Sequence, residues 1–371
     1  MRRYLSEIIS SSEFCVIDTS VLTHPFDNIC REMFDIRSYD NISMEKIDDM
    51  RRALNYMDEI QKIKNLYVVE GTCDEILSLN EIFSSKLKYL NTNQFFERKK
   101  DFKKQKFKIK TKRKLSISKR IEGYWKLNQN NFGRDEQKRE ALEEISYEIL
   151  QFSKKLRNEN VYRIPKDVYN AFLKLAEVQN KRIEKIEWKF KYTPRVSRIL
   201  SKPKNLADIE IVATALSLPL FGISPDIVTA DSDIHNMLRY SYAFLVWKTE
   251  APHAKFFTEI YRKYPIVCWF VNPAKRDRTD LNEIETILEF DSSEDREFDR
   301  AQYKLWYPKK LKKELKKEMH IVYRVANENH WDRSCRKSEK SNRDIYPEQK
   351  EETYYTLYEQ GDFEFGQRGK T

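Results

Sequence analysis

Four acidic residues stand where a sequence pattern ends a strand or begins a helix: Asp18, Glu75, Asp208 and Asp231. Asp18 follows an apolar run at residues 14–17, and Asp231 follows a second short apolar run. Ligands of open parallel sheets gather at the carboxyl ends of the strands, and helices that begin there can point to the same edge. Carboxylates gathered at one edge repel one another unless a cation intervenes, and oxygen ligands suit Mg²⁺ or Mn²⁺. The set, with Asp233 as a fifth member, therefore predicts a divalent metal site.

The elements that would position these acids alternate between strands and helices. Strand patterns occupy residues 14–17, 66–69, 226–229 and 265–271, and helical spacing of apolar residues occupies 47–60, 205–216 and 256–261. A further helix is expected to start with Thr72 as its N-cap, because Thr72 and Glu75 have the spacing of a capping box. Such alternation is typical of an α/β fold with a central parallel sheet.

The alternation pauses over residues 91–202, which we interpret as a basic, largely helical insertion. Helices are expected from about residue 134 to 156 and after Pro165, since proline favours the first turn of a helix. Phe107, Ile109 and Thr111 alternate with lysines, and this period of two predicts a strand or ribbon. The insertion divides the core into residues 1–90 and 203–275. Residues 276–371 form a C-terminal extension that is expected to be partly disordered.

The positive charge of the chain is concentrated in one segment. The formal net charge is +10, and the segment 98–114 contains eleven basic residues against one acid, a surplus equal to that of the whole chain. These basic residues are the candidates for contact with a nucleic acid backbone: Arg98, Lys99, Lys100, Lys103, Lys104, Lys106, Lys108, Lys110, Lys112, Arg113 and Lys114. The alternative is a solvated charged face, which is the usual role of such a run. A second basic run, from Lys309 to Lys317, has the same two interpretations.

Several other function classes find no support in the sequence. The seven glycines form neither GxxxxGK[ST] nor GxGxxG, which argues against a glycine-rich nucleotide site. The five cysteines are scattered without a CxxC pair, which argues against a disulfide framework and a structural zinc site and indicates a reducing cytoplasm. No run of about 18 apolar residues is present, so no membrane span is expected.

The acidic segments resemble those of the PIN-domain family of nucleases. The resemblance rests on four segments in order: Asp18-Thr19-Ser20 after a strand, Glu75 early in a helix, Asp208 in the first turn of an apolar helix, and Thr229-Ala230-Asp231-Ser232-Asp233 after a strand. It covers about residues 12–80 and 203–272. It implies a three-layer fold around a parallel sheet, with Asp18, Glu75, Asp208 and Asp231 as catalytic residues that bind Mg²⁺ or Mn²⁺ together with Asp233. Thr19, Ser20 and Thr229 would support these carboxylates by hydrogen bonds.

The resemblance implies a metal-dependent hydrolase of phosphodiester bonds, an endoribonuclease, acting on RNA or less often on DNA. Two alternatives stay open: an inactive PIN-like scaffold that binds nucleic acid or protein, and a toxin or defence nuclease controlled by a partner. Each acid also has an ordinary alternative role as a helix cap or a solvated turn residue. A protein partner bound through the insertion or the C-terminal extension, and a homo-oligomer, are compatible with the sequence.

Overall fold

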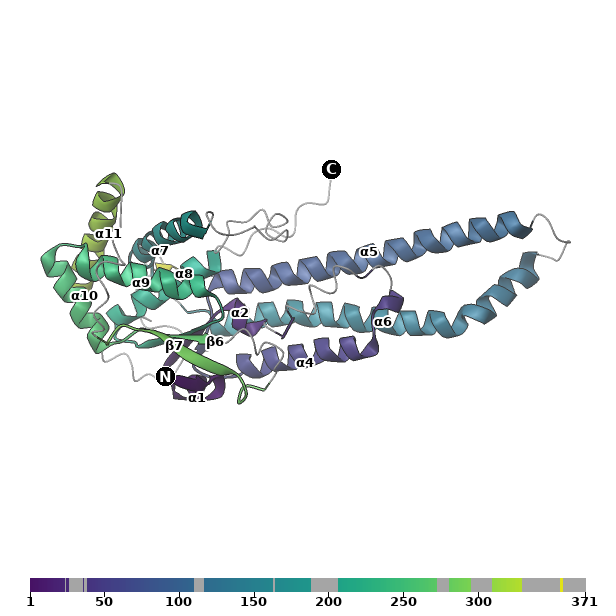
Figure 1. Ribbon diagram of the computed structural model, residues 1–371, viewed down its shortest axis with the longest axis horizontal. Coiled ribbons are helices and arrows are strands. Elements are labelled where there is room, and N and C mark those ends of the chain that lie inside the picture. Colours follow the sequence, from purple (N-terminus) through teal and green to yellow (C-terminus); the bar gives the residue numbers. More distant parts are fainter. Residues whose placement is uncertain are drawn as a thin grey trace. The chain divides into compact units, whose positions relative to one another are not determined.

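The computed structural model describes residues 1–23, 25–26, 36, 39–109, 117–162, 164–187, 206–271, 280–294, 309–328 and 354–355 (Figure 1). The chain divides into two compact units. Unit 1 comprises Met1–Leu22, Ile60–Glu75 and Lys154–Thr371, and unit 2 comprises Thr23–Glu59 and Ile76–Ser153. The four acidic segments all belong to unit 1.

Unit 1 is built on a six-stranded sheet with the order β1-β7-β6-β5-β2-β3. Its strands are β1 (Arg2–Tyr4), β2 (Phe14–Ile17), β3 (Leu66–Tyr67), β5 (Pro225–Thr229), β6 (Val267–Val271) and β7 (Glu285–Asp291). The four consecutive strands β3, β2, β5 and β6 are parallel, whereas β7 pairs with β6, and β1 with β7, in antiparallel fashion. The α/β class is confirmed, but the expectation of a parallel sheet is wrong at one side, where the sheet is mixed.

The two antiparallel strands escaped the sequence analysis because their patterns are weak. β1 is three residues long and contains Arg2 and Arg3. β7 has the sequence ETILEFD, in which acids stand at both ends and a third, Glu289, interrupts the apolar residues. The four predicted strands, by contrast, overlap with β2, β3, β5 and β6, with ends that differ by up to two residues outside β2. They were found because strands covered on both faces read as continuous apolar runs.

Helices pack around this sheet. They are α1 (Leu5–Ser11), α2 (Thr19–Leu22), α7 (Lys166–Glu187), α8 (Leu206–Ser217), α9 (Ser232–Trp247), α10 (Ala251–Lys263) and α11 (Lys309–Glu328), with the short η3 helix (Leu218–Phe221) after α8. Helix α8 is buried along its whole length from Ala207 to Ser217, which explains why its sequence is apolar on nearly every side. Helix α7 packs against α8, α9 and α11. A small second sheet pairs β4 (Ile164–Pro165) with β8 (Tyr354–Tyr355).

Two long helices belong partly to each unit: α5 (Glu70–Ile109) and α6 (Ile117–Asn160) (Figure 1). Helix α5 corrects two predictions. It begins at Glu70, so Thr72 lies inside the helix and is not its N-cap. It also includes Phe107 and Ile109, so the expected strand or ribbon is wrong there, while residues 110–114 lie outside the described part of the chain.

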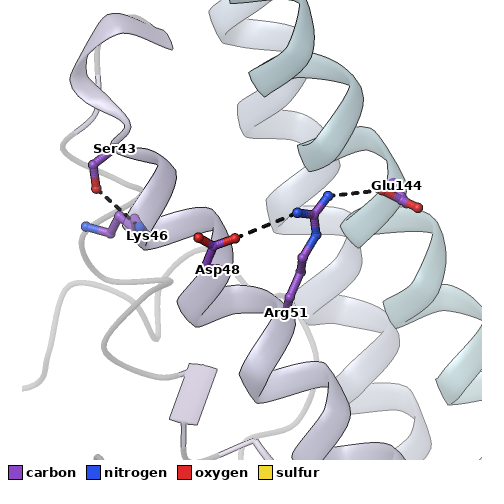
Figure 2. Close-up of polar contacts among 5 residues, drawn as sticks. All are labelled: Ser43, Lys46, Asp48, Arg51 and Glu144. Atoms are coloured by element: carbon purple, nitrogen blue, oxygen red, sulfur yellow. Dashed lines mark hydrogen bonds and ion pairs between the residues drawn. The ribbon is translucent and has the colours of Figure 1, made fainter.

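Unit 2 contains the η1 turn (Tyr39–Asn41) and most of α4 (Met44–Gln61), whose predicted apolar stripe is buried. Arg51 of α4 lies 3.7 Å from Asp48 and 3.5 Å from Glu144 of α6 (Figure 2). Ser43 accepts a hydrogen bond from the Lys46 N–H at 3.2 Å before the first turn of α4. Because the ion pairs of Arg51 are solvent-exposed, they contribute at most about 1 kcal/mol, and apolar burial dominates the stability of this unit.

The C-terminal extension and the membrane prediction can each be compared with the described residues. No helix among the described residues is both long and apolar enough to cross a membrane. The extension contributes β7, α11 and β8, and the part for which disorder was expected lies almost entirely outside the described residues.

Candidate metal centre

Asp18 is positioned by the pairing of β2 with β5. Val228 lies opposite Ile17 in this parallel pair, and the Asp18 N–H continues the ladder by donating to the Val228 carbonyl at 3.0 Å. The side chain is 2% exposed. Its Oδ2 accepts hydrogen bonds from the Ser20 hydroxyl and from the Thr229 hydroxyl, the latter at 2.9 Å. Burial raises the pKa of Asp18 to about 6, against the effect of the two hydroxyls.

The end of β5 is joined to the end of β2 through the same hydroxyls. The Ala230 N–H donates to Ser20 Oγ at 3.0 Å, and the Asp231 N–H donates to Thr229 Oγ1 at 2.8 Å. Asp231 is the N-cap of α9 and accepts a hydrogen bond from the Asp233 N–H at 2.8 Å. Two hydroxyls and one cap therefore hold Asp18 and Asp231 at adjacent strand ends.

Glu75 and Asp208 come from two helices that touch at their starts. A Cβ atom added to Gly71 of α5 would lie 2.7 Å from Ala207 Cα of α8, a distance that no side chain tolerates. The Gly71 N–H donates to Glu210 Oε2 at 2.7 Å. Because Asp208 is next to Ala207 and Glu75 is one helical turn after Gly71, this glycine contact places the two acids near each other.

The five candidate acids lie close enough together for their charges to interact. Burial is the main reason that the pKa of Asp208 lies well above its usual value, and the negative charges of the other four acids raise it further: Asp18, Asp231, Glu75 and Asp233. Asp208 is 8% exposed. Glu75 is solvent-exposed, yet the partial burial of its carboxyl raises its pKa to about 7, with further contributions from Asp18 and Asp231 and an opposing hydrogen bond from Thr19.

The donor set fits a hard divalent cation. Its candidate donors are all carboxylate oxygens, and among the described residues no basic side chain shifts the pKa values of Asp18, Glu75 and Asp208. Oxygen donors of this kind suit Mg²⁺ or Mn²⁺. Within the described residues, however, no group of three or more His, Cys, Asp or Glu side chains is arranged closely enough to hold a metal ion. An ion bound here would therefore have to draw the carboxylates together.

A second group of acids, absent from the sequence analysis, lies at the start of α5. Arg157 of α6 bonds to Asp74 at 2.7 Å and lies 3.6 Å from Glu70. Burial raises the pKa values of Glu70 and Glu210 to about 7. A signal in the sequence was Gly71, because glycine permits the close approach of another backbone.

The basic residues predicted to contact nucleic acid remain untested by the structure. Arg98 to Lys108 belong to α5, but only the backbone of this part of the helix is described. Lys110, Lys112, Arg113 and Lys114 lie outside the described residues.

Comparisons of the chain with protein-family models, with curated proteins and with solved structures found no match. The resemblance to PIN domains thus rests on the four acidic segments themselves. The structure itself shows an α/β fold with a mixed six-stranded sheet.

Proposed function

We propose that the protein is a metal-dependent PIN-type nuclease that hydrolyses phosphodiester bonds of RNA as an endoribonuclease. The observation that carries this proposal is the group of carboxylates around Asp208. They come from the ends of β2 and β5 and the starts of α5 and α8, and they raise one another's pKa values, with no basic side chain of the described part of the chain among the causes. Uncompensated acids at such an edge are costly to keep, and a bound cation would remove that cost.

The chain's own residues have separable roles in this proposal. A bound Mg²⁺ or Mn²⁺ would supply an activated water and would neutralise charge on the phosphate. Ser20 and Thr229 fix the orientation of the Asp18 carboxylate by their hydrogen bonds. Glu75, which interacts electrostatically with Asp18 and Asp231, would hold the ion together with Asp18. Asp208, Asp231 and Asp233 complete the ligand set.

RNA is the proposed substrate because of the resemblance and because the charge surplus lies in one basic segment, 98–114. Phosphate contacts by lysine and arginine supply sequence-independent affinity for a nucleic acid strand. A cytoplasmic location, a protein partner and self-association are additional parts of the proposal that follow from the sequence alone.

The direct test is the double variant Asp18→Asn/Asp231→Asn, assayed on circular single-stranded RNA and on single-stranded DNA with Mg²⁺ and with Mn²⁺. Cleavage of the circular RNA by the natural protein, and its loss in the variant, would support a metal-dependent endonuclease. The control is Asp167→Asn/Asp280→Asn, which removes the same charge from two exposed acids outside the candidate site. Equal cleavage by both double variants would refute the assignment.

The same experiment separates the two alternatives. RNA binding without cleavage under any divalent ion, unchanged in the Asp18→Asn/Asp231→Asn variant, would favour a PIN-like scaffold. Growth arrest on expression, relieved by that variant but not by the control, would favour a nuclease toxin held in check by a partner.

A further inference from the structure

The second basic run of the sequence forms α11, and one side of this helix is fixed in unit 1. Leu315, Met319 and Val322 recur at steps of four and three and are fully buried in the core. Glu318 forms a 2.7 Å ion pair with Lys174 of α7, and α11 also packs on α10 (Figure 1). The orientation of the helix is therefore set by apolar burial together with a polar contact.

The charges of α11 are segregated around its axis. Glu314 and Glu318 both contribute to raising the pKa of Lys174, and the hydrogen bond to Glu318 is the largest cause. At about 100° per residue, four lysines project from the opposite flank: Lys312, Lys313, Lys316 and Lys317. The ion pairs within the described part of the chain include none of these four lysines, so their charge is not neutralised there.

We propose that this lysine flank of α11 binds the phosphate backbone of single-stranded RNA. The lysines form two rows, 312 with 316 and 313 with 317, in which the residues are about 6 Å apart along the axis. A fixed array of ammonium groups binds successive phosphates through charge and independently of sequence. The inference rests on the proposed function only in choosing RNA as the polyanion.

A membrane surface fits this helix less well than a nucleic acid does. Basic amphipathic helices that bind membranes place their apolar face among the lipids. In α11 the corresponding residues Leu315, Met319 and Val322 are already buried against the rest of unit 1. The lysine flank could therefore bind a membrane only by electrostatic attraction to lipid head groups.

The test measures binding in the absence of divalent ions, so cleavage does not intervene. The full chain and its variants are titrated into fluorescent oligouridylate of about 20 nucleotides, in EDTA, at salt concentrations from 50 to 300 mM. The charge-removing variant is Lys313→Gln/Lys317→Gln, which changes the two exposed members of the flank. The control variant Lys64→Gln/Lys255→Gln removes the same charge from two exposed lysines of unit 1. The charge-preserving variant is Lys313→Arg/Lys317→Arg.

Each phosphate contact adds about 0.7 to the slope of log affinity against log salt for single strands. The Lys313→Gln/Lys317→Gln variant should therefore lose about 1.4 from the slope and bind about tenfold more weakly near 100 mM salt, whereas the control and the arginine variant should keep both values. An equal loss in the control, or no loss in either, would overturn the proposal. So would lysine-dependent binding to phosphatidylserine vesicles without RNA binding. If Asp18→Asn/Asp231→Asn binds normally but the natural protein does not cleave, the proposed function fails while the RNA-binding surface stands.

Discussion

Replacing Asp18 by Asn should stabilise the metal-free protein at neutral pH while it abolishes cleavage. Asp18 is 2% exposed, and its pKa is raised from 3.8 to about 6. One pKa unit corresponds to about 1.4 kcal/mol, so ionising Asp18 in the folded protein costs up to about 3 kcal/mol. Asn keeps one oxygen that can accept the hydrogen bonds of Ser20 and Thr229, and it removes the charge. We expect a gain of about 1–3 kcal/mol in the free energy of unfolding.

The sign of the pH dependence follows from linkage. Below pH 4 the carboxyl is protonated in both the folded and the unfolded chain, and no ionisation cost arises. Between about pH 4 and pH 6 the unfolded chain loses this proton first, so the stability of the natural protein falls as the pH rises. The advantage of the Asp18→Asn variant should therefore be small at pH 4, grow up to about pH 6, and stay constant above it.

Urea unfolding in EDTA at pH 4, 5, 6 and 7.5 measures this difference, with Asp167→Asn, at an exposed acid, as the control variant. Saturating Mn²⁺ should then stabilise the natural protein, by about 2.7 kcal/mol at 100 times the dissociation constant, and the Asp18→Asn variant far less. A variant less stable than the natural protein at pH 7.5, or an advantage that does not change with pH, would refute the reasoning.

Three further predictions concern contacts around the site and α11. Gly71→Ala should lower the free energy of unfolding by about 1–3 kcal/mol and reduce cleavage, because the added Cβ would lie 2.7 Å from Ala207 Cα. Urea unfolding and the circular-RNA assay measure these effects, and unchanged values would contradict the prediction. Arg157→Gln should cost about 2–4 kcal/mol, because two acids lose their counter-charge; an effect below 1 kcal/mol in urea unfolding would contradict it. His253 Nε2 lies 3.2 Å from His320 Nδ1 of α11, and burial lowers the pKa of His253, so protonation below pH 6.5 should weaken the packing of α11. Hydrogen exchange of α11 at pH 5.5 and 7.5 measures this. The variant His253→Gln should remove the pH dependence.

The sequence predicted the local features of the site well, because they depend on neighbours in the chain. Asp18 was identified from the apolar run that it ends, and that run is β2. Asp231 was identified in the same way from β5, and it caps α9. Parallel pairing of these two strands, which the alternation of strands and helices predicted, is what places both acids at one edge.

The contacts that the sequence did not predict join residues far apart in the chain. Glu210 and Gly71 are separated by 139 positions, and Arg157 and Asp74 by 83. No periodic pattern links such residues, since their contact depends on how α5, α6 and α8 pack. The error at Phe107 and Ile109 has a different origin: a period of two over a few residues was outweighed by the continuation of a helix from Glu70, in a segment rich in lysine, which favours helices.

Neighbouring residues of α5 show how the two groups of acids differ. Asp74 faces Arg157, which also lies near Glu70, so this group contains its own counter-charge. Glu75, the next residue, interacts instead with Asp18 and Asp231, and within the described residues the groups that act on its pKa, besides burial, are acids and the Thr19 hydroxyl. A chain selected for stability alone could neutralise the second group as it neutralises the first. Among the described residues, no basic side chain acts on the pKa values of Asp18, Glu75 and Asp208, and their mutual repulsion lowers the stability of the metal-free fold. In the proposed function, a divalent cation with its preference for oxygen ligands would supply the positive charge that this group lacks.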